Sequence, residues 1–224
     1  MLFIWLFLYG AVMLLAKAAA PMFSFAPTVA LVLYTTALVI WIMAAGKAPA
    51  LGFQKVSLTA FRKHLFFIPY LTPVFYNIFR FGFLFPAGRQ LPGIVCAVIL
   101  EEILFRGFLT QWLCRRSLFW GVILSGLAFG IAHMVNLESG MLPTAVVCQM
   151  LFALCVGIAL SGLRLSARSI YPGIGVHLLI NLTAGSGENV AKDPLFWISM
   201  AMCLFCGIRS VSLLRKESSY EIIH

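Results

Sequence analysis

The sequence predicts an all-α membrane protein, a polytopic bundle of about eight transmembrane helices in a single domain. Of its 224 residues, 62% are hydrophobic and only 10% are charged, against roughly a quarter in a soluble domain. Apolar runs long enough to cross about 30 Å of hydrocarbon also recur from end to end. The net charge of +9 therefore concerns membrane topology, and we expect no nucleic-acid partner.

Eight apolar segments are separated by Pro, Gly or charged residues. They lie at roughly 2–16, 27–45, 65–79, 93–113, 118–136, 142–162, 170–184 and 195–214. Pro69 and Pro73 interrupt the third segment, which is therefore expected to be kinked. The first segment has the apolar core and Ala-rich end of a signal peptide but no positive region before it. We interpret it as a retained span, and its cleavage would leave seven.

The distribution of Lys and Arg orients the predicted bundle. The even-numbered gaps between segments and the C-terminal tail hold ten of these residues, namely Lys47, Lys55, Arg62, Lys63, Arg115, Arg116, Arg164, Arg168, Arg215 and Lys216. The odd-numbered gaps hold four, namely Lys17, Arg80, Arg89 and Lys192. This alternation predicts an integral membrane protein with both termini in the cytoplasm.

Three ionisable residues lie inside the fourth segment, in "LEEILFRGFL". Each charge near the bilayer centre costs on the order of 3 kcal/mol on insertion scales, so such residues pair or face a polar cavity. Glu102 and Arg106 are four residues apart and can pair on one helix face. Glu101 is rotated about 100° away and faces something else. Taken alone, the cluster could serve only to hold helices together.

Two later segments offer polar partners. "FGIAH" places Phe129 and His133 four residues apart, and "HLLIN" does the same for His177 and Asn181. At 1.5 Å per residue, Glu101, His177 and His133 lie about 12, about 10 and about 5 Å from the outer ends of their segments. Either His alone could simply be a hydrogen bonder between helices. One polar pocket in the outer half of the bundle explains all three segments together.

Glycines beside these motifs predict close helix packing. Gly126 and Gly130 form a small-xxx-small pair just before His133, a spacing that lets helix backbones approach. Gly173 and Gly175 precede His177 and are also expected to help helix approach.

The polar residues favour hydrolysis by an activated water. Glu101 beside a His can act as general base on water, and His177 and Asn181 can donate to a developing oxyanion. The chain has no GxSxG, no HExxH and a single Asp, Asp193, so the motifs of serine, zinc-helix and paired-aspartate proteases are missing. The predicted reaction is water attack on an amide carbonyl, with no acyl-enzyme, cofactor or metal ion.

The motifs "EEILFRG", "FGIAH" and "HLLIN", in this order, resemble the CAAX-protease and bacteriocin-processing (ABI) family of glutamic-type intramembrane endopeptidases. They match the family patterns EExxxR, FxxxH and HxxxN within about 93–184, which leaves 1–79 and 195–224 as additional spans. The resemblance implies that Glu101 and His133 activate the water while His177 and Asn181 stabilise the oxyanion. It also implies that the site is supported by Glu102, Arg106 and Phe129.

The resemblance further implies a membrane-associated protein or peptide substrate, cut within the lipid bilayer. The family's founding activity removes the last three residues of prenylated CAAX proteins, whereas prokaryotic relatives mature peptides, confer bacteriocin immunity or cut C-terminal sorting anchors. The length and simple termini are typical of a bacterial member in the cytoplasmic membrane. A pocket in the outer half suits an exported protein's anchor helix. The sequence identifies neither the substrate nor the oligomeric state.

Three other functions fit the same residues. Glu101, His133 and His177 could supply three zinc ligands to a membrane metalloprotease. The chain could instead be a non-catalytic immunity or partner protein, or a proton-coupled transporter that uses intramembrane Glu and His. Chelator sensitivity, the phenotype of Glu101→Gln and pH-driven uptake distinguish these functions from the peptidase.

Overall fold

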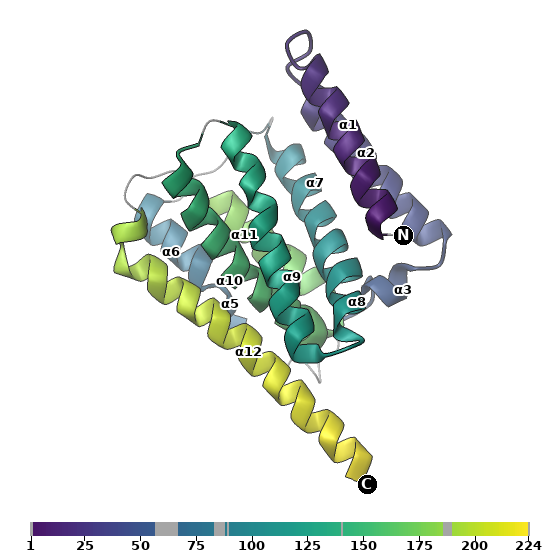
Figure 1. The fold of residues 1–224 in the computed structure, drawn as a ribbon, viewed down its shortest axis with the longest axis vertical. Coiled ribbons are helices and arrows are strands. Elements are labelled where there is room, and N and C mark those ends of the chain that lie inside the picture. Colours follow the sequence, from purple (N-terminus) through teal and green to yellow (C-terminus); the bar gives the residue numbers. More distant parts are fainter. Residues whose placement is uncertain are drawn as a thin grey trace.

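The computed structural model describes residues 2–56, 67–82, 88, 90–139, 141–185 and 190–223, and every regular element in these ranges is helical. The all-α prediction is therefore confirmed. The α1–α2 hairpin stands beside α7 at one side of the bundle, and α12 runs along another side and extends beyond it (Figure 1). Arg62, Lys63 and Arg89, which the topology prediction counted, lie outside the described residues.

Each of the eight apolar segments corresponds to one or more helical elements. In chain order the described elements are α1 (Leu2–Ala19), α2 (Ala26–Ala44), α3 (Ala48–Leu51), α5 (Phe67–Tyr70), α6 (Thr72–Phe81), α7 (Leu91–Glu101), the π-helix η1 (Glu102–Leu109), α8 (Thr110–Cys114), α9 (Leu118–Ala132), the 3-10 helix η2 (His133–Ser139), α10 (Pro143–Ala167), α11 (Tyr171–Thr183), the 3-10 helix η3 (Val190–Lys192) and α12 (Pro194–Ile223). Of these, the short helices α3 and η3 lie between the predicted segments. The break expected near Pro69 and Pro73 separates α5 from α6, and the Thr72 hydroxyl donates to the Pro69 carbonyl at 2.8 Å.

Within the residues that the structure describes, four helical stretches are long and apolar enough to cross a membrane, namely 26–44, 118–137, 143–167 and 194–216. α1 is apolar but shorter, over Ile4–Ala19. The polytopic membrane class is thus confirmed, whereas the count of eight spans is not. α7 is only 11 residues long, because the π-helix η1 follows directly after Glu101. α11 is also short, with 13 residues between Tyr171 and Thr183.

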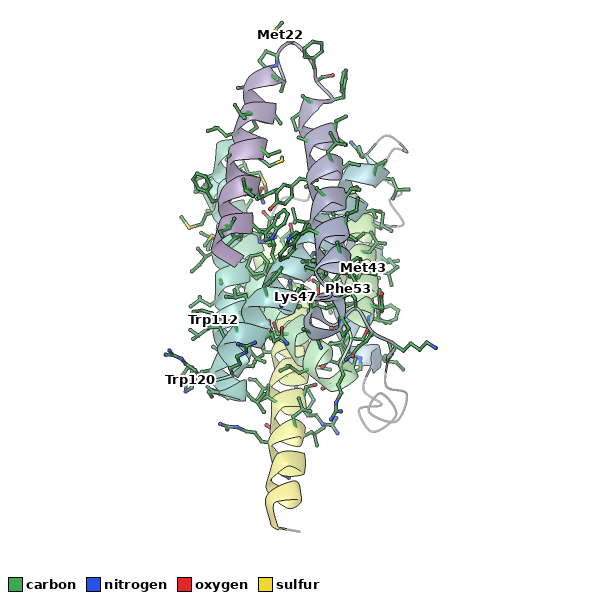
Figure 2. All side chains as sticks on the ribbon, turned by 90° about the vertical axis from the view of Figure 1, so that its right-hand side faces the viewer. Met22, Met43, Lys47, Phe53, Trp112 and Trp120 are labelled. Carbon is green, nitrogen blue, oxygen red and sulfur yellow. The ribbon has the colours of Figure 1, made fainter. Side chains whose placement is uncertain are left out.

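Exposed aromatic and basic side chains gather at the turn between α8 and α9. Trp112 and Trp120 are 53% and 60% exposed, and Arg115 and Arg116 between them are exposed as well. In Figure 2, Met22 lies at the tip of the α1–α2 hairpin, and both tryptophans lie toward the opposite end of the bundle. Exposed Trp beside Arg is typical of a membrane–water interface. We call this region the α8–α9 end.

Close packing of α9 on α10 positions the second motif. A Cβ atom on Gly126 would lie 2.9 Å from the Ile158 backbone nitrogen, and one on Gly130 would lie 2.7 Å from the Met150 carbonyl oxygen. The close approach expected from this glycine pair is therefore confirmed, with α10 as the partner. It fixes the end of α9 that carries His133.

Candidate active site

The first motif lies where α7 gives way to a π-helix. Glu101 ends α7 and Glu102 begins η1, so the segment predicted over 93–113 is helical throughout but changes from α-helix to π-helix at this point. π-helical turns are rare in proteins, but those that occur often lie at functional sites. The Phe105 carbonyl accepts the Thr110 N–H five residues later and also lies 3.4 Å from the Ser125 hydroxyl. The irregular turn is therefore held by a neighbouring helix.

A buried hydroxyl cluster extends this support. Thr110 Oγ1 lies 2.7 Å from Ser125 Oγ and 3.1 Å from Ser161 Oγ. All three side chains are buried, and they come from α8, α9 and α10. Because buried hydroxyls must find partners, the cluster ties η1 and α8 to both helices.

Glu102 is the buried centre of the motif. Its Oε1 lies 3.0 Å from Arg106 Nη1 and 2.9 Å from His177 Nδ1, and its side chain is fully buried. The expected pairing with Arg106 is present. The bond to His177 was not expected, since Glu102 had been assigned only to Arg106. A buried carboxylate is stable only with such compensating partners.

Glu101 approaches the same imidazole through its other nitrogen. Glu101 Oε2 lies 3.5 Å from His177 Nε2, and the Glu101 side chain is 34% exposed where that of Glu102 is fully buried. The two adjacent glutamates therefore flank His177, one from the protein interior and one from an accessible position.

The Phe129 ring joins the two histidines. Its centroid lies 5.0 Å from the His133 ring and 5.6 Å from the His177 ring, both edge-on. Arg106 Cζ lies 4.1 Å from the same centroid, within the range of a cation–π contact. Phe129 thus covers the buried guanidinium and places both imidazoles around one aromatic side chain.

His133 and Asn181 lie at the margin of this cluster. His133 Nδ1 lies 2.9 Å from the Phe129 carbonyl, which can only accept, so Nδ1–H donates to it and Nε2 is the nitrogen left for other contacts. Asn181 is one turn after His177 on α11. Both side chains are half-buried. Among the described residues, no hydrogen bond joins either one to Glu101.

The part of the chain that forms this site matches a known protein family. Residues 83–183 match the family model for Rce1-like type II CAAX prenyl endopeptidases. Over these residues the chain matches the CAAX-protease and bacteriocin-processing family. No match was found among curated proteins or solved structures. The family match and the apolar helices together indicate an integral membrane protein related to a protease family.

Two further positions near the site are identified only by the structure. A Cβ atom on Gly173 would lie 2.9 Å from Glu102 Oε2, whereas one on Gly175 would meet nothing within 4 Å. Of the two glycines before His177, only Gly173 therefore permits the approach of α11. Tyr9 of α1 lies close enough to Glu101 for the two to interact electrostatically. No motif around Tyr9 marks it in the sequence.

The glutamate and histidine side chains of the site are also residue types that bind metal ions. In the part of the chain that the structure describes, no group of three or more His, Cys, Asp or Glu side chains is arranged to hold a metal ion. The six cysteines are all free, and Cys203 and Cys206 of the CxxC are buried.

Proposed function

We propose that this chain is a glutamic-type intramembrane endopeptidase that hydrolyses a peptide bond of a membrane-associated protein or peptide. Glu101 is the general base, and His133 helps to position the water. His177 and Asn181 donate to the oxyanion. The observation that carries the proposal is the 3.5 Å approach of Glu101 Oε2 to His177 Nε2 at a carboxylate that is still 34% exposed. The general base Glu101 and the oxyanion donor His177 then lie side by side at a position that a substrate can reach.

The reaction follows from these roles. Glu101 takes a proton from the water, whose oxygen bonds to the amide carbon. The carbonyl oxygen becomes an oxyanion that accepts hydrogen bonds from His177 Nε2–H and the Asn181 amide. The C–N bond then breaks, and Glu101 returns its proton to the departing amine. No covalent enzyme intermediate forms.

The proposed donor role sets a requirement on His177. The buried Glu102 carboxylate accepts Nδ1–H at 2.9 Å, so Nε2 can donate to the oxyanion only if the ring carries a second proton. In that form the imidazolium and the Arg106 guanidinium balance the charges of the Glu101 and Glu102 carboxylates.

The substrate class is tested by comparing membrane peptidomes of cells that carry the wild type or Glu101→Ala. We expect a C-terminal or leader fragment of a membrane-associated protein to disappear in the variant. A farnesylated CAAX peptide offered to the purified chain tests the founding family activity directly. Identical peptidomes in the two strains, with no peptide cleaved in vitro, would contradict a peptidase and favour a non-catalytic partner protein.

Metal dependence separates this proposal from a zinc protease. We expect cleavage to persist after treatment with a strong chelator and the purified protein to contain no stoichiometric zinc. Activity that is lost on chelation and restored by Zn²⁺ would instead assign Glu101, His133 and His177 as ligands.

We also propose that the chain lies in a bacterial cytoplasmic membrane with both termini in the cytoplasm. The excess of Lys and Arg in alternate gaps supports this orientation. Reporter fusions at each terminus test it. Labelling of cysteines introduced near His133 tests whether substrates reach the site from the extracytoplasmic side. Labelling from the cytoplasmic side alone would reject entry from the extracytoplasmic side.

A further inference from the structure

A polar pocket of about 300 Å³ is lined by Arg106 but not by Glu101, Glu102 or His177. Figure 2 labels Lys47 and Phe53, which flank α3, and α3 forms one wall. The polar side chains that line it are Gln54, Arg106, Gln111, Arg164 and Arg168. Three guanidinium groups and two carboxamides thus surround this space, and its described lining includes no carboxylate.

Two of these guanidinium groups are buried and incompletely bonded. Arg164 is 9% exposed, and its Nε has no hydrogen-bond partner among the described residues. Arg106 is 1% exposed, and its Nε and Nη2 likewise have none in that part of the chain. Glu102 compensates one charge, that of Arg106. Because a buried donor without an acceptor is costly, the pocket favours an anion.

The pocket walls are tied together before any ligand binds. Three hydrogen bonds of 2.5 to 3.0 Å join residues 52–54 to 168–170. The Arg164 guanidinium packs against Gly52, where a Cβ atom would lie 2.5 Å from it. Gly52 also has a φ of +91°, which side-chain-bearing residues rarely adopt. The positive φ favours glycine there, and the absence of a side chain leaves room for the Arg164 guanidinium beside it.

We propose that this pocket binds a phosphate group, and that its source is the headgroup of an anionic phospholipid. Guanidinium forks match phosphate oxygens in charge and geometry. The pocket lies between α3, α8 and the last turn of α10, toward the α8–α9 end, where Trp112 and Trp120 mark a membrane interface. Headgroup phosphates lie at that depth. This inference goes beyond the proposed peptidase and does not depend on it.

An anion in the pocket would also reach the glutamate–histidine cluster. Arg106 lines the pocket and pairs with Glu102, which in turn holds His177. Phosphate binding would therefore fix the guanidinium that positions Glu102.

Binding to the full-length protein in a non-ionic detergent tests the proposal. Native mass spectrometry counts bound phosphatidylglycerol, with diacylglycerol of the same chains as the phosphate-free probe, and calorimetry measures inorganic phosphate. The variants are Arg164→Gln and Arg168→Asn. Asn suits position 168 because its φ is +54° and Asn tolerates that region. Arg116→Gln removes an exposed charge at the same end and is the matched control.

We expect one phosphatidylglycerol to bind per chain in the wild type and in Arg116→Gln. In Arg164→Gln and in Arg168→Asn we expect phosphatidylglycerol to bind at least about tenfold more weakly, because each variant loses one charged hydrogen bond. Inorganic phosphate that binds with the same dependence on both arginines, without the lipid, would assign free phosphate as the source. Equal losses in Arg116→Gln, or unchanged binding in Arg168→Asn, would overturn the proposal. So would diacylglycerol that binds as well as phosphatidylglycerol. If Arg164→Gln fails to fold, the exposed Arg168 still decides the outcome.

Discussion

His177 Nδ1 lies 2.9 Å from Glu102 Oε1, across 75 residues of sequence. The second glutamate of the EExxxR motif is thus the residue that orients the histidine. Glu102 is fixed in turn by Arg106 at 3.0 Å, so the imidazole is held by a buried ion pair. Glu101 then faces the remaining ring nitrogen at 3.5 Å. Holding one side of the ring and presenting the other is how a protein sets a histidine's tautomer and direction.

The two glutamates are expected to differ in what their loss does. Glu102→Gln removes the counter-charge of buried Arg106 and should destabilise the protein by about 3–5 kcal/mol, with activity lost. Glu101→Gln breaks no fully buried pair, so it should abolish cleavage without a large change in Tm. Thermal unfolding in detergent and peptide cleavage measure both. Equal losses of stability in Glu101→Gln and Glu102→Gln would contradict a structural role for Glu102 and a purely catalytic role for Glu101.

Gly173→Ala should impair the site, because the added Cβ would lie 2.9 Å from Glu102 Oε2. The carboxylate or α11 must shift, so we expect cleavage to fall at least tenfold, as a cost of roughly 1.4 kcal/mol would produce. Gly175→Ala is the matched control, since its Cβ would meet nothing within 4 Å. Similar cleavage by the two variants would show that the close contact at Gly173 has no importance.

Phe129→Leu should weaken the packing around Arg106, whose Cζ lies 4.1 Å from the ring centroid. Loss of the cation–π and edge-on contacts should cost about 1–2 kcal/mol and reduce activity, because both imidazoles also contact this ring. Phe119→Leu removes a ring that lies 5.8 Å from Arg215 and should cost less. Chemical unfolding of both variants measures the difference, and a larger loss for Phe119→Leu would be contrary evidence.

Thr110→Val tests the hydroxyl cluster that supports the π-helix. Valine keeps the shape but removes the partner of Ser125 and Ser161, and leaving buried hydroxyls short of partners costs about 1–3 kcal/mol. We expect a lower Tm and, because η1 carries Glu102 and Arg106, slower cleavage. Ser212→Ala removes an exposed helical hydroxyl and should change neither quantity. Unfolding and cleavage rates are compared for the two, and unchanged values in Thr110→Val would exclude the supporting role.

Local spacing accounts for the features that could be predicted. The Glu102–Arg106 pair is four residues apart within one helical element, and the break between Pro69 and Pro73 follows from proline's fixed φ and missing N–H. Glycine spacing likewise indicated the close packing that Gly126 and Gly130 make. Such features depend on neighbours within a turn or two of the chain.

The amino-acid sequence alone thus determined an all-α membrane class, the three motifs and the local ion pair. Only the tertiary structure decided that Glu102 holds His177, that Gly173 rather than Gly175 faces the carboxylate, and that Arg164 and Arg168 join Arg106 around one pocket. It also decided the π-helical turn, which hydropathy cannot distinguish from an α-helix. The physical reason is that contacts between distant segments depend on how each helix is rotated and offset against its neighbours, and apolar residues around the whole circumference of these helices leave that rotation unspecified.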